Sequence, residues 1–248
     1  MSSSPLRIVA GVVLGAMAGL SAVFAADVKA EFHFVALDRN EVKVFFYSDG
    51  EVAVATAGRR FSAPVEYDGF PKVRFFGSEQ DITQALGGKK VEPVGVIDLP
   101  AKGGRFLLFL RDGEPAAGGE AAAAGEGLAI TALDLSGTRL PKSGMIFANL
   151  TTKPLDVTLG KFEQGVAPGK HVVLQQRDMG PDGGSVVFQV SAKEGERERR
   201  FIETVTSLSS RGCKVTICIE EASGSRTTVR SRSLVIDPEA EAEAAGKP

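Results

Sequence analysis

From residue 27 to residue 236, short runs of apolar, β-branched and aromatic residues alternate with short stretches rich in Gly, Pro, Asp and Ser. Runs of this length and composition are typical of β-strands, and the residues between them are those that turns use. Residues 78–86 alone favour a helix, of one or two turns, with Ser78 as its N-cap. The pattern predicts strands at residues 31–37, 42–47, 51–56, 61–67, 72–76, 94–99, 105–111, 128–135, 144–150, 155–159, 161–166, 171–175, 185–193, 198–206, 213–221 and 227–236.

Three of these segments carry further information. Ser48-Asp49-Gly50 lies between two strand-like runs and predicts a hairpin turn. Pro64 suits an edge strand or a bend. Residues 106–110, Phe-Leu-Leu-Phe-Leu, form a continuous apolar run, which is typical of a strand covered on both faces.

A polar segment with Gly and Pro, residues 136–143, divides the strands into two sets. Each set has eight predicted segments in roughly 100 residues, close to the seven strands of a Greek-key β-sandwich of the immunoglobulin type. The sequence therefore predicts an all-β protein with two consecutive antiparallel β-sandwich (Ig-like) domains, at residues 27–135 and 136–237. We find no strict residue repeat between the two sets, so the sequence does not indicate a duplication.

Two segments are predicted to lie outside the packed sandwiches. Residues 114–127 contain Ala, Gly, Glu and Pro but no bulky apolar residue, so they cannot bury enough surface to offset the entropy of ordering. We interpret them as a mobile loop between two strands of the first domain. Residues 238–248 are acidic and rich in Ala, and we expect a disordered tail there.

Residues 1–26 have the features of a secretory signal peptide. Arg7 precedes an apolar stretch over residues 8–20, and Val23 and Ala25 occupy the −3 and −1 positions of a cleavage site after Ala25. The stretch is interrupted by glycines and is shorter than the roughly 20 residues of a spanning helix. Removal is therefore favoured, and retention as an anchor is the alternative. We expect a periplasmic or secreted protein whose mature chain has no transmembrane segment.

The chain has two cysteines, Cys213 and Cys218. Five residues of extended chain separate their Cα atoms by roughly 16 Å, whereas a disulfide needs about 7 Å or less. An odd separation also places the two side chains on opposite faces of a strand. The favoured interpretation is two small buried or half-buried residues. A disulfide across a bulge or turn, and a bridge to another chain, are the alternatives.

The most distinctive stretch is Met145-Ile146-Phe147-Ala148-Asn149-Leu150-Thr151, followed by Pro154-Leu155-Asp156-Val157 and by Ala167-Pro168-Gly169-Lys170. It resembles the start of sandwich domains in exported bacterial proteins, where an F-x-N-x-T strand precedes a hairpin and an x-P-G turn. Periplasmic pilus chaperones and fibronectin-type or other Ig-like modules share this style. The chain thus resembles uncharacterised exported bacterial proteins with tandem Ig-like β-sandwich domains. The resemblance implies adhesion, assembly or scaffold roles. The first half has no basic pair that maps onto the chaperones' subunit-anchoring site, so the chaperone activity is not carried over.

Residues that perform chemistry are few and scattered. His33 and His171, the only histidines, each lie alone in a predicted strand without further metal ligands at a suitable spacing. Asp178 and Asp182 lie in a loop that lacks the alternating ligands and terminal Glu of an EF-hand. The glycosylation sequon at Asn149 is interpreted as coincidence. No nucleophile elbow or phosphate-binding loop is present. We therefore predict no catalytic, metal or cofactor site, and no enzyme.

Charge is balanced along the chain, with 29 Lys and Arg, 31 Asp and Glu, and a formal net charge of −2. This count, together with export, argues against nucleic acid as a partner. Arg226, Arg230 and Arg232 alternate along the last predicted strand, and Arg230 and Arg232 share a face. This arginine stripe is a candidate site for an anionic partner such as a polysaccharide or lipid headgroups. The alternative is a solvated face, paired with Glu198 and Glu203, that keeps an edge strand from aggregating.

The sequence thus predicts a non-enzymatic binding or scaffold protein of the bacterial cell envelope. It would act through loops and strand edges on an envelope protein or a polysaccharide. The competing hypothesis is an exported hydrolase or ligand carrier with a site in the cleft between the two domains, lined by His33 or His171. A third hypothesis is assembly by strand addition, which needs an unprotected edge strand.

Overall fold

The computed structural model describes residues 27–112, 128–138, 140–141, 143–175, 185–194, 197–207, 212–223 and 226–236. In this part the chain is mostly strand, with one short helix. The predicted signal peptide at 1–26, the loop at 114–127 and the tail at 238–248 lie outside the described residues, as do Asp178 and Asp182. None of the helical structure in these ranges is long and apolar enough to cross a membrane.

The elements are β1 (Val28–Ala36), β2 (Glu41–Ser48), β3 (Glu51–Gly58), β4 (Val65–Gly69), β5 (Lys72–Phe75), α1 (Glu79–Leu86), β6 (Gly95–Asp98), β7 (Gly104–Arg111), β8 (Ala129–Asp134), β9 (Ser143–Leu150), β10 (Leu155–Leu159), β11 (Phe162–Val166), β12 (His171–Gln175), β13 (Val186–Glu194), β14 (Arg197–Thr206), β15 (Gly212–Ser223) and β16 (Arg226–Ile236).

Strands β1–β8, the first half, form two facing sheets. One sheet has the order β4-β1-β7-β8, and the other joins the hairpin β2-β3 to the hairpin β5-β6. The join lies at Phe45 and Phe76, whose main-chain N–H groups donate to each other's carbonyl oxygens at 2.9 and 2.8 Å. The second sheet therefore runs β3-β2-β5-β6.

Strands β9–β16, the second half, repeat this order. Their sheets run β12-β9-β15-β16 and β11-β10-β13-β14. Numbered within each half, both halves have one sheet of order 4-1-7-8 and one of order 3-2-5-6. No residue repeat marks this shared order in the sequence, because a strand order depends on alternation and turn positions that many different residues satisfy.

The strand directions differ in part from the predicted antiparallel sheets. Most neighbouring strands are antiparallel, but β1 pairs with β7, and β9 with β15, in parallel. In each half the chain leaves the first strand, passes through the other sheet, returns for the fourth strand, passes through the other sheet again and comes back at the seventh strand. A parallel pair requires such a long crossover, whereas a hairpin produces an antiparallel pair. The pattern of apolar residues along a strand does not indicate whether the strand pairs in parallel or antiparallel.

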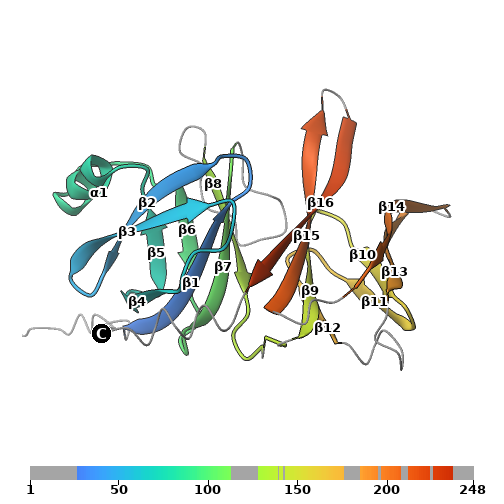
Figure 1. Cartoon of the computed structure of the whole chain (residues 1–248). Helices are drawn as coiled ribbons and strands as arrows, with labels where there is room; N and C mark the ends of the chain where they lie inside the picture. The colour runs from blue at the N-terminus through green and yellow to red at the C-terminus, as the bar shows by residue number, and fades with distance from the viewer. Residues whose placement is uncertain are drawn as a thin grey trace, which may run out of the picture.

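The sheets stack as four layers, from β3-β2-β5-β6 at one side to β11-β10-β13-β14 at the other (Figure 1). Each space between neighbouring layers is filled by a cluster of buried apolar side chains. The middle cluster combines Val35, Leu107 and Phe109 of the first half with Ile146 and Ile217 of the second. The two halves thus pack on each other through the sheets that contain β1 and β9.

The five residues 106–110 of β7 confirm the interpretation of their apolar run. All five side chains are at most 3% exposed. Phe106, Leu108 and Leu110 face the cluster inside the first half, whereas Leu107 and Phe109 face the middle cluster. A strand that is covered on both faces has no solvent side, so it needs no polar alternation.

Two further sequence predictions, the helix cap at Ser78 and the hairpin turn at Asp49-Gly50, are also confirmed. Ser78 caps α1, since its hydroxyl accepts from the N–H of Asp81 at 3.1 Å. Asp49 and Gly50 form the two-residue turn between β2 and β3, with φ angles of 48° and 80°. Positive φ at both central residues is the type I′ geometry that Asp-Gly favours.

Candidate functional site

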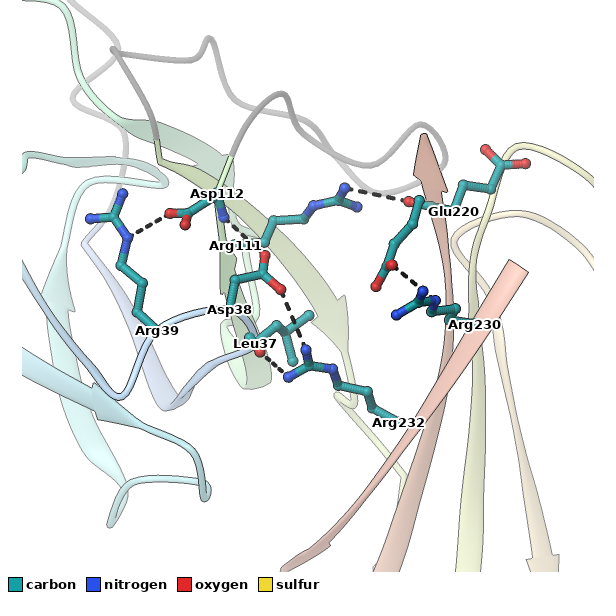
Figure 2. Close-up of polar contacts among 9 residues, drawn as sticks. Leu37, Asp38, Arg39, Arg111, Asp112, Glu220, Arg230 and Arg232 are labelled. Atoms are coloured by element: carbon teal, nitrogen blue, oxygen red, sulfur yellow. Dashed lines mark hydrogen bonds and ion pairs between the residues drawn. The ribbon is translucent and has the colours of Figure 1, made fainter. Parts of the chain in front are cut away.

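The predicted arginine stripe lies on β16, an edge strand of the sheet that packs against the first half. Arg226 is the first residue of β16. Arg230 and Arg232 project on the same side, toward the first half (Figure 2). The Nε of Arg230 lies 3.0 Å from a carboxylate oxygen of Glu221 on the neighbouring strand β15.

Arg232 reaches across the boundary between the halves. Its guanidinium donates to the main-chain carbonyl oxygen of Leu37 and lies 3.4 Å from Oδ1 of Asp38 (Figure 2). Leu37 is buried, so Arg232 supplies a hydrogen bond there in place of water. Binding of an anionic partner at Arg226, Arg230 and Arg232 stays a prediction, and that partner would compete with these internal contacts.

A seam of paired charges continues from Arg232 around the end of β7. Arg111 crosses the boundary in the opposite direction, and its Nη2 donates to the main-chain carbonyl of Glu220 at 3.4 Å. Asp112 accepts from the Nε of Arg39 at 2.5 Å. The N–H of Asp112 also donates to a carboxylate oxygen of Asp38 at 3.1 Å. Asp112 and Asp38 pair with Arg39 and Arg232, and Arg111 and Arg232 each bond a main-chain carbonyl across the boundary, so the seam is better suited to holding the halves together than to attracting an anion.

We expect Arg232→Gln to lower the free energy of unfolding by about 1–2 kcal/mol, because the shorter side chain leaves the carbonyl of Leu37 without its charged donor. Arg230→Gln is the matched control. It removes one exposed ion pair and should change stability by less than about 0.5 kcal/mol. Urea denaturation of the two variants measures both effects. Equal losses would contradict a special role of Arg232 at the boundary.

His33 lies in a buried polar group on β1. Its Nε2 is 3.0 Å from Oε1 of Glu31, and its Nδ1 is 3.3 Å from the carbonyl oxygen of Ser62. Arg105 donates to the same oxygen of Glu31 at 2.6 Å. Burial raises the pKa of Glu31, but the hydrogen bond from His33 and the charge of Arg105 outweigh it, so the pKa lies below its ordinary value. Both ring nitrogens of His33 thus contact oxygens of neighbouring residues, so the side chain is engaged within the fold.

His171 is half-buried on β12, with Nε2 at 3.1 Å from the hydroxyl of Thr138. Burial lowers the pKa of His171, while Asp134 opposes this shift and Lys170 adds to it. Neither histidine lines the cavity beside β1 and β4 or the cavity beside α1, whose walls the described residues supply.

The F-x-N-x-T stretch has a structural role at the end of β9. Asn149 is fully buried, and its Nδ2 donates to the carbonyls of Lys153 and Val166 at 2.7 and 2.9 Å. Its Oδ1 accepts from the N–H and the hydroxyl of Thr151 at 3.0 and 2.7 Å. The amide thus ties the turn after β9 to the end of β11. Because it is enclosed in the fold, it is no acceptor for a glycan, in line with the interpretation of the sequon.

The two cysteines confirm the favoured interpretation. Cys213 and Cys218 are buried thiols on opposite faces of β15, Cys213 in the middle cluster and Cys218 in the cluster inside the second half. Burial raises the pKa of Cys218 to about 12. The two side chains are not joined in a disulfide, so that alternative is wrong.

The structure presents an open strand edge that the sequence analysis did not identify. β3 pairs with β2, and no other described strand pairs with it. Its eight residues contain no Lys, Arg or Pro, which edge strands commonly carry to block pairing with another chain. The long edge strands of the second half, β14 and β16, both carry several arginines. Val52 and Val54 of β3 are 37% and 54% exposed.

The register of the hairpin decides which backbone groups of β3 face outward. In a hairpin with a two-residue turn, the flanking residues Ser48 and Glu51 form a hydrogen-bonded pair, and bonded and non-bonded pairs alternate from there. Val52, Val54 and Thr56 therefore direct their N–H and C=O groups away from β2. The open side of β3 thus offers a donor and an acceptor at every second residue.

No protein-family model matches this chain, and a search of curated proteins finds no match either. The candidate site is therefore defined by the geometry of the β3 edge alone.

Proposed function

We propose that this chain is an exported, non-enzymatic binding or scaffold protein of the bacterial cell envelope, and that it holds a partner protein by strand addition at β3. The observation that carries the proposal is the open edge of β3, which contains no Lys, Arg or Pro. Export follows from the interpretation of residues 1–26. The shared strand order of the halves supports the further proposal that they are tandem Ig-like sandwich domains.

Strand addition needs main-chain hydrogen bonds for affinity and a surface for alternate side chains for specificity. The outward backbone groups of Val52, Val54 and Thr56 meet the first need. Val52 and Val54 also meet the second, because they stand on the outer face beside their cross-strand neighbours Tyr47 and Phe45. We therefore expect an extended partner segment with apolar side chains at alternate positions.

The inner face of β3 supports this role by holding the strand in place. Ala55 and Ala57 are 2% and 0% exposed and belong to the buried cluster inside the first half. A strand that is fixed before binding loses little conformational entropy when a partner pairs with it. The edge is thus preorganised for addition.

Photo-cross-linking in the native envelope tests this proposal. A benzophenone amino acid replaces Val52 in the test protein and Val205 in the control. Val205 is 67% exposed on β14, an edge strand rich in charged residues. We expect the probe at position 52, and not the probe at position 205, to cross-link reproducibly to one envelope protein that mass spectrometry identifies.

A second variant ties the cross-link to the backbone of β3. Val54→Pro removes one outward N–H and leaves the hydrogen bonds to β2 in place, since Val54 stands at a non-bonded pair. We expect it to abolish cross-linking from position 52 while the thermal unfolding midpoint stays within a few degrees of that of the parent protein. Cross-links that survive Val54→Pro, or that occur equally from position 205, would overturn strand addition at β3.

A further inference from the structure

A groove lies over the outer face of the first half, bounded by α1, β2, β5 and the turn between β4 and β5. Its volume is about 440 Å³, within the range of small-molecule sites. Phe70, in the turn, is 60% exposed, and Leu86, in the last turn of α1, is 55% exposed. Exposing large apolar side chains to water is unfavourable, and their gathering at one concave place is typical of a binding site.

The walls of the groove are fixed by contacts within the chain. The hydroxyl of Tyr67 donates to the carbonyl oxygen of Phe70 at 2.6 Å. The N–H of Leu99 donates to the carbonyl oxygen of Pro71, also at 2.6 Å. Ile82, 1% exposed, anchors α1. A ligand would therefore meet a preformed surface, which reduces the entropy lost on binding.

The charge of the groove is of one sign. Lys72 and Arg74, two residues apart on β5, both line it, and no carboxylate does so among the residues that form its walls. The Nζ of Lys72 lies 3.7 Å from a carboxylate oxygen of Asp98. Arg74 is exposed and forms no hydrogen bond or ion pair with any residue in the described ranges. A guanidinium in this position can bind a carboxylate through two parallel hydrogen bonds.

We propose that this groove binds a small amphipathic carboxylate, with its apolar chain against Phe70 and Leu86 and its carboxylate on Arg74. The site adjoins the open edge of β3, since Tyr47 lines the groove and pairs with Val52, but no residue of β3 lines it and the proposal does not depend on strand addition. It also differs from the predicted cleft between the halves, where the middle cluster of apolar side chains lies. It adds a ligand site on the outer layer of the first half.

The composition of the chain supplies a direct probe of this groove. The chain has two tyrosines and no tryptophan, and both tyrosines, Tyr47 and Tyr67, line the groove. Tyrosine fluorescence of the purified protein therefore reports on this groove, and the Arg74→Gln variant below separates the groove from the cavity beside β1 and β4, which Tyr67 also lines. We expect octanoate at pH 7 to change the emission in a saturable way, and 1-octanol, which has the same chain without the charge, to bind about tenfold more weakly.

Variants separate the charged contact from the apolar one. Arg74→Gln should weaken octanoate binding about tenfold and leave 1-octanol unchanged, whereas Leu86→Asn should weaken both. Lys161→Gln, an exposed cation of the second half, is the matched control and should affect neither. A fluorescence signal that does not saturate, equal affinities for the two probes, or an affinity for octanoate that Arg74→Gln leaves unchanged would overturn the proposal. Val54→Pro should leave octanoate binding intact. The tests of the groove and of strand addition at β3 therefore have independent outcomes.

Discussion

Phe109→Ala should lower the free energy of unfolding by about 3–5 kcal/mol, one of the largest effects of any single substitution in this chain. Phe109 is 0% exposed in the middle cluster, and its ring meets that of Phe61 edge-on with 5.9 Å between centroids. The cavity left by alanine would weaken the contact between the halves as well as the first half itself. We therefore expect hydrogen exchange to accelerate in β15 as well as in β7, with one unfolding transition in urea.

The control for this experiment is Phe70→Ala. Phe70 is 60% exposed, so its loss should change stability by about 0.5 kcal/mol or less. If Phe109→Ala accelerates exchange in β7 while β15 keeps the protection of the parent protein, the middle cluster does not couple the halves. Two separate transitions in the parent protein would lead to the same conclusion.

Asn149→Ala should lower the free energy of unfolding by about 3 kcal/mol. The substitution removes four hydrogen bonds at a fully buried place, and the carbonyl of Val166 loses its side-chain donor. The carbonyl of Lys153 keeps the hydroxyl of Thr151 as a donor at 3.0 Å. Chemical denaturation measures the loss. Thr152→Ala, in the same turn but exposed, is the control and should cost about 0.5 kcal/mol or less.

Asn149→Asp keeps the shape of the side chain but replaces the amide N–H donors, so it tests what the donated hydrogen bonds contribute. Above the pKa of the new acid, both of its oxygens only accept, and they face the carbonyls of Lys153 and Val166. We expect a loss at pH 7 at least as large as that of Asn149→Ala, and a partial recovery at acidic pH, where the protonated acid donates once. A variant as stable as the parent protein at pH 7 would show that the donated hydrogen bonds contribute little.

The strands and their turns were predictable because each is specified by nearby residues. The Asp49-Gly50 turn, the Ser78 cap and the apolar run at 106–110 each depend on a few consecutive positions. The opposite faces of Cys213 and Cys218 likewise follow from an odd separation along one strand. All of these features hold in the structure.

Features that depend on distant parts of the chain were not predictable in the same way. The alternation of Arg230 and Arg232 placed them on one face, but nothing near Arg232 identifies its acceptor, the carbonyl of Leu37, 195 residues away. The parallel pairs and the open side of β3 require the strand order, which the periodicity of a single strand does not contain. The groove combines Phe70, Arg74 and Leu86 from three elements, so its apolar and cationic sides meet only in the folded chain.

The four stacked layers turn the molecule into a spacer of fixed length (Figure 1). Neighbouring sheets pack about 10 Å apart, so three such steps set the two outer sheets about 30 Å from each other. Because the middle cluster leaves no flexible joint between the inner sheets, this distance does not vary as it would across a linker. A tether that joins ligands on both outer faces must span it, and a shorter tether gains no avidity from the second face.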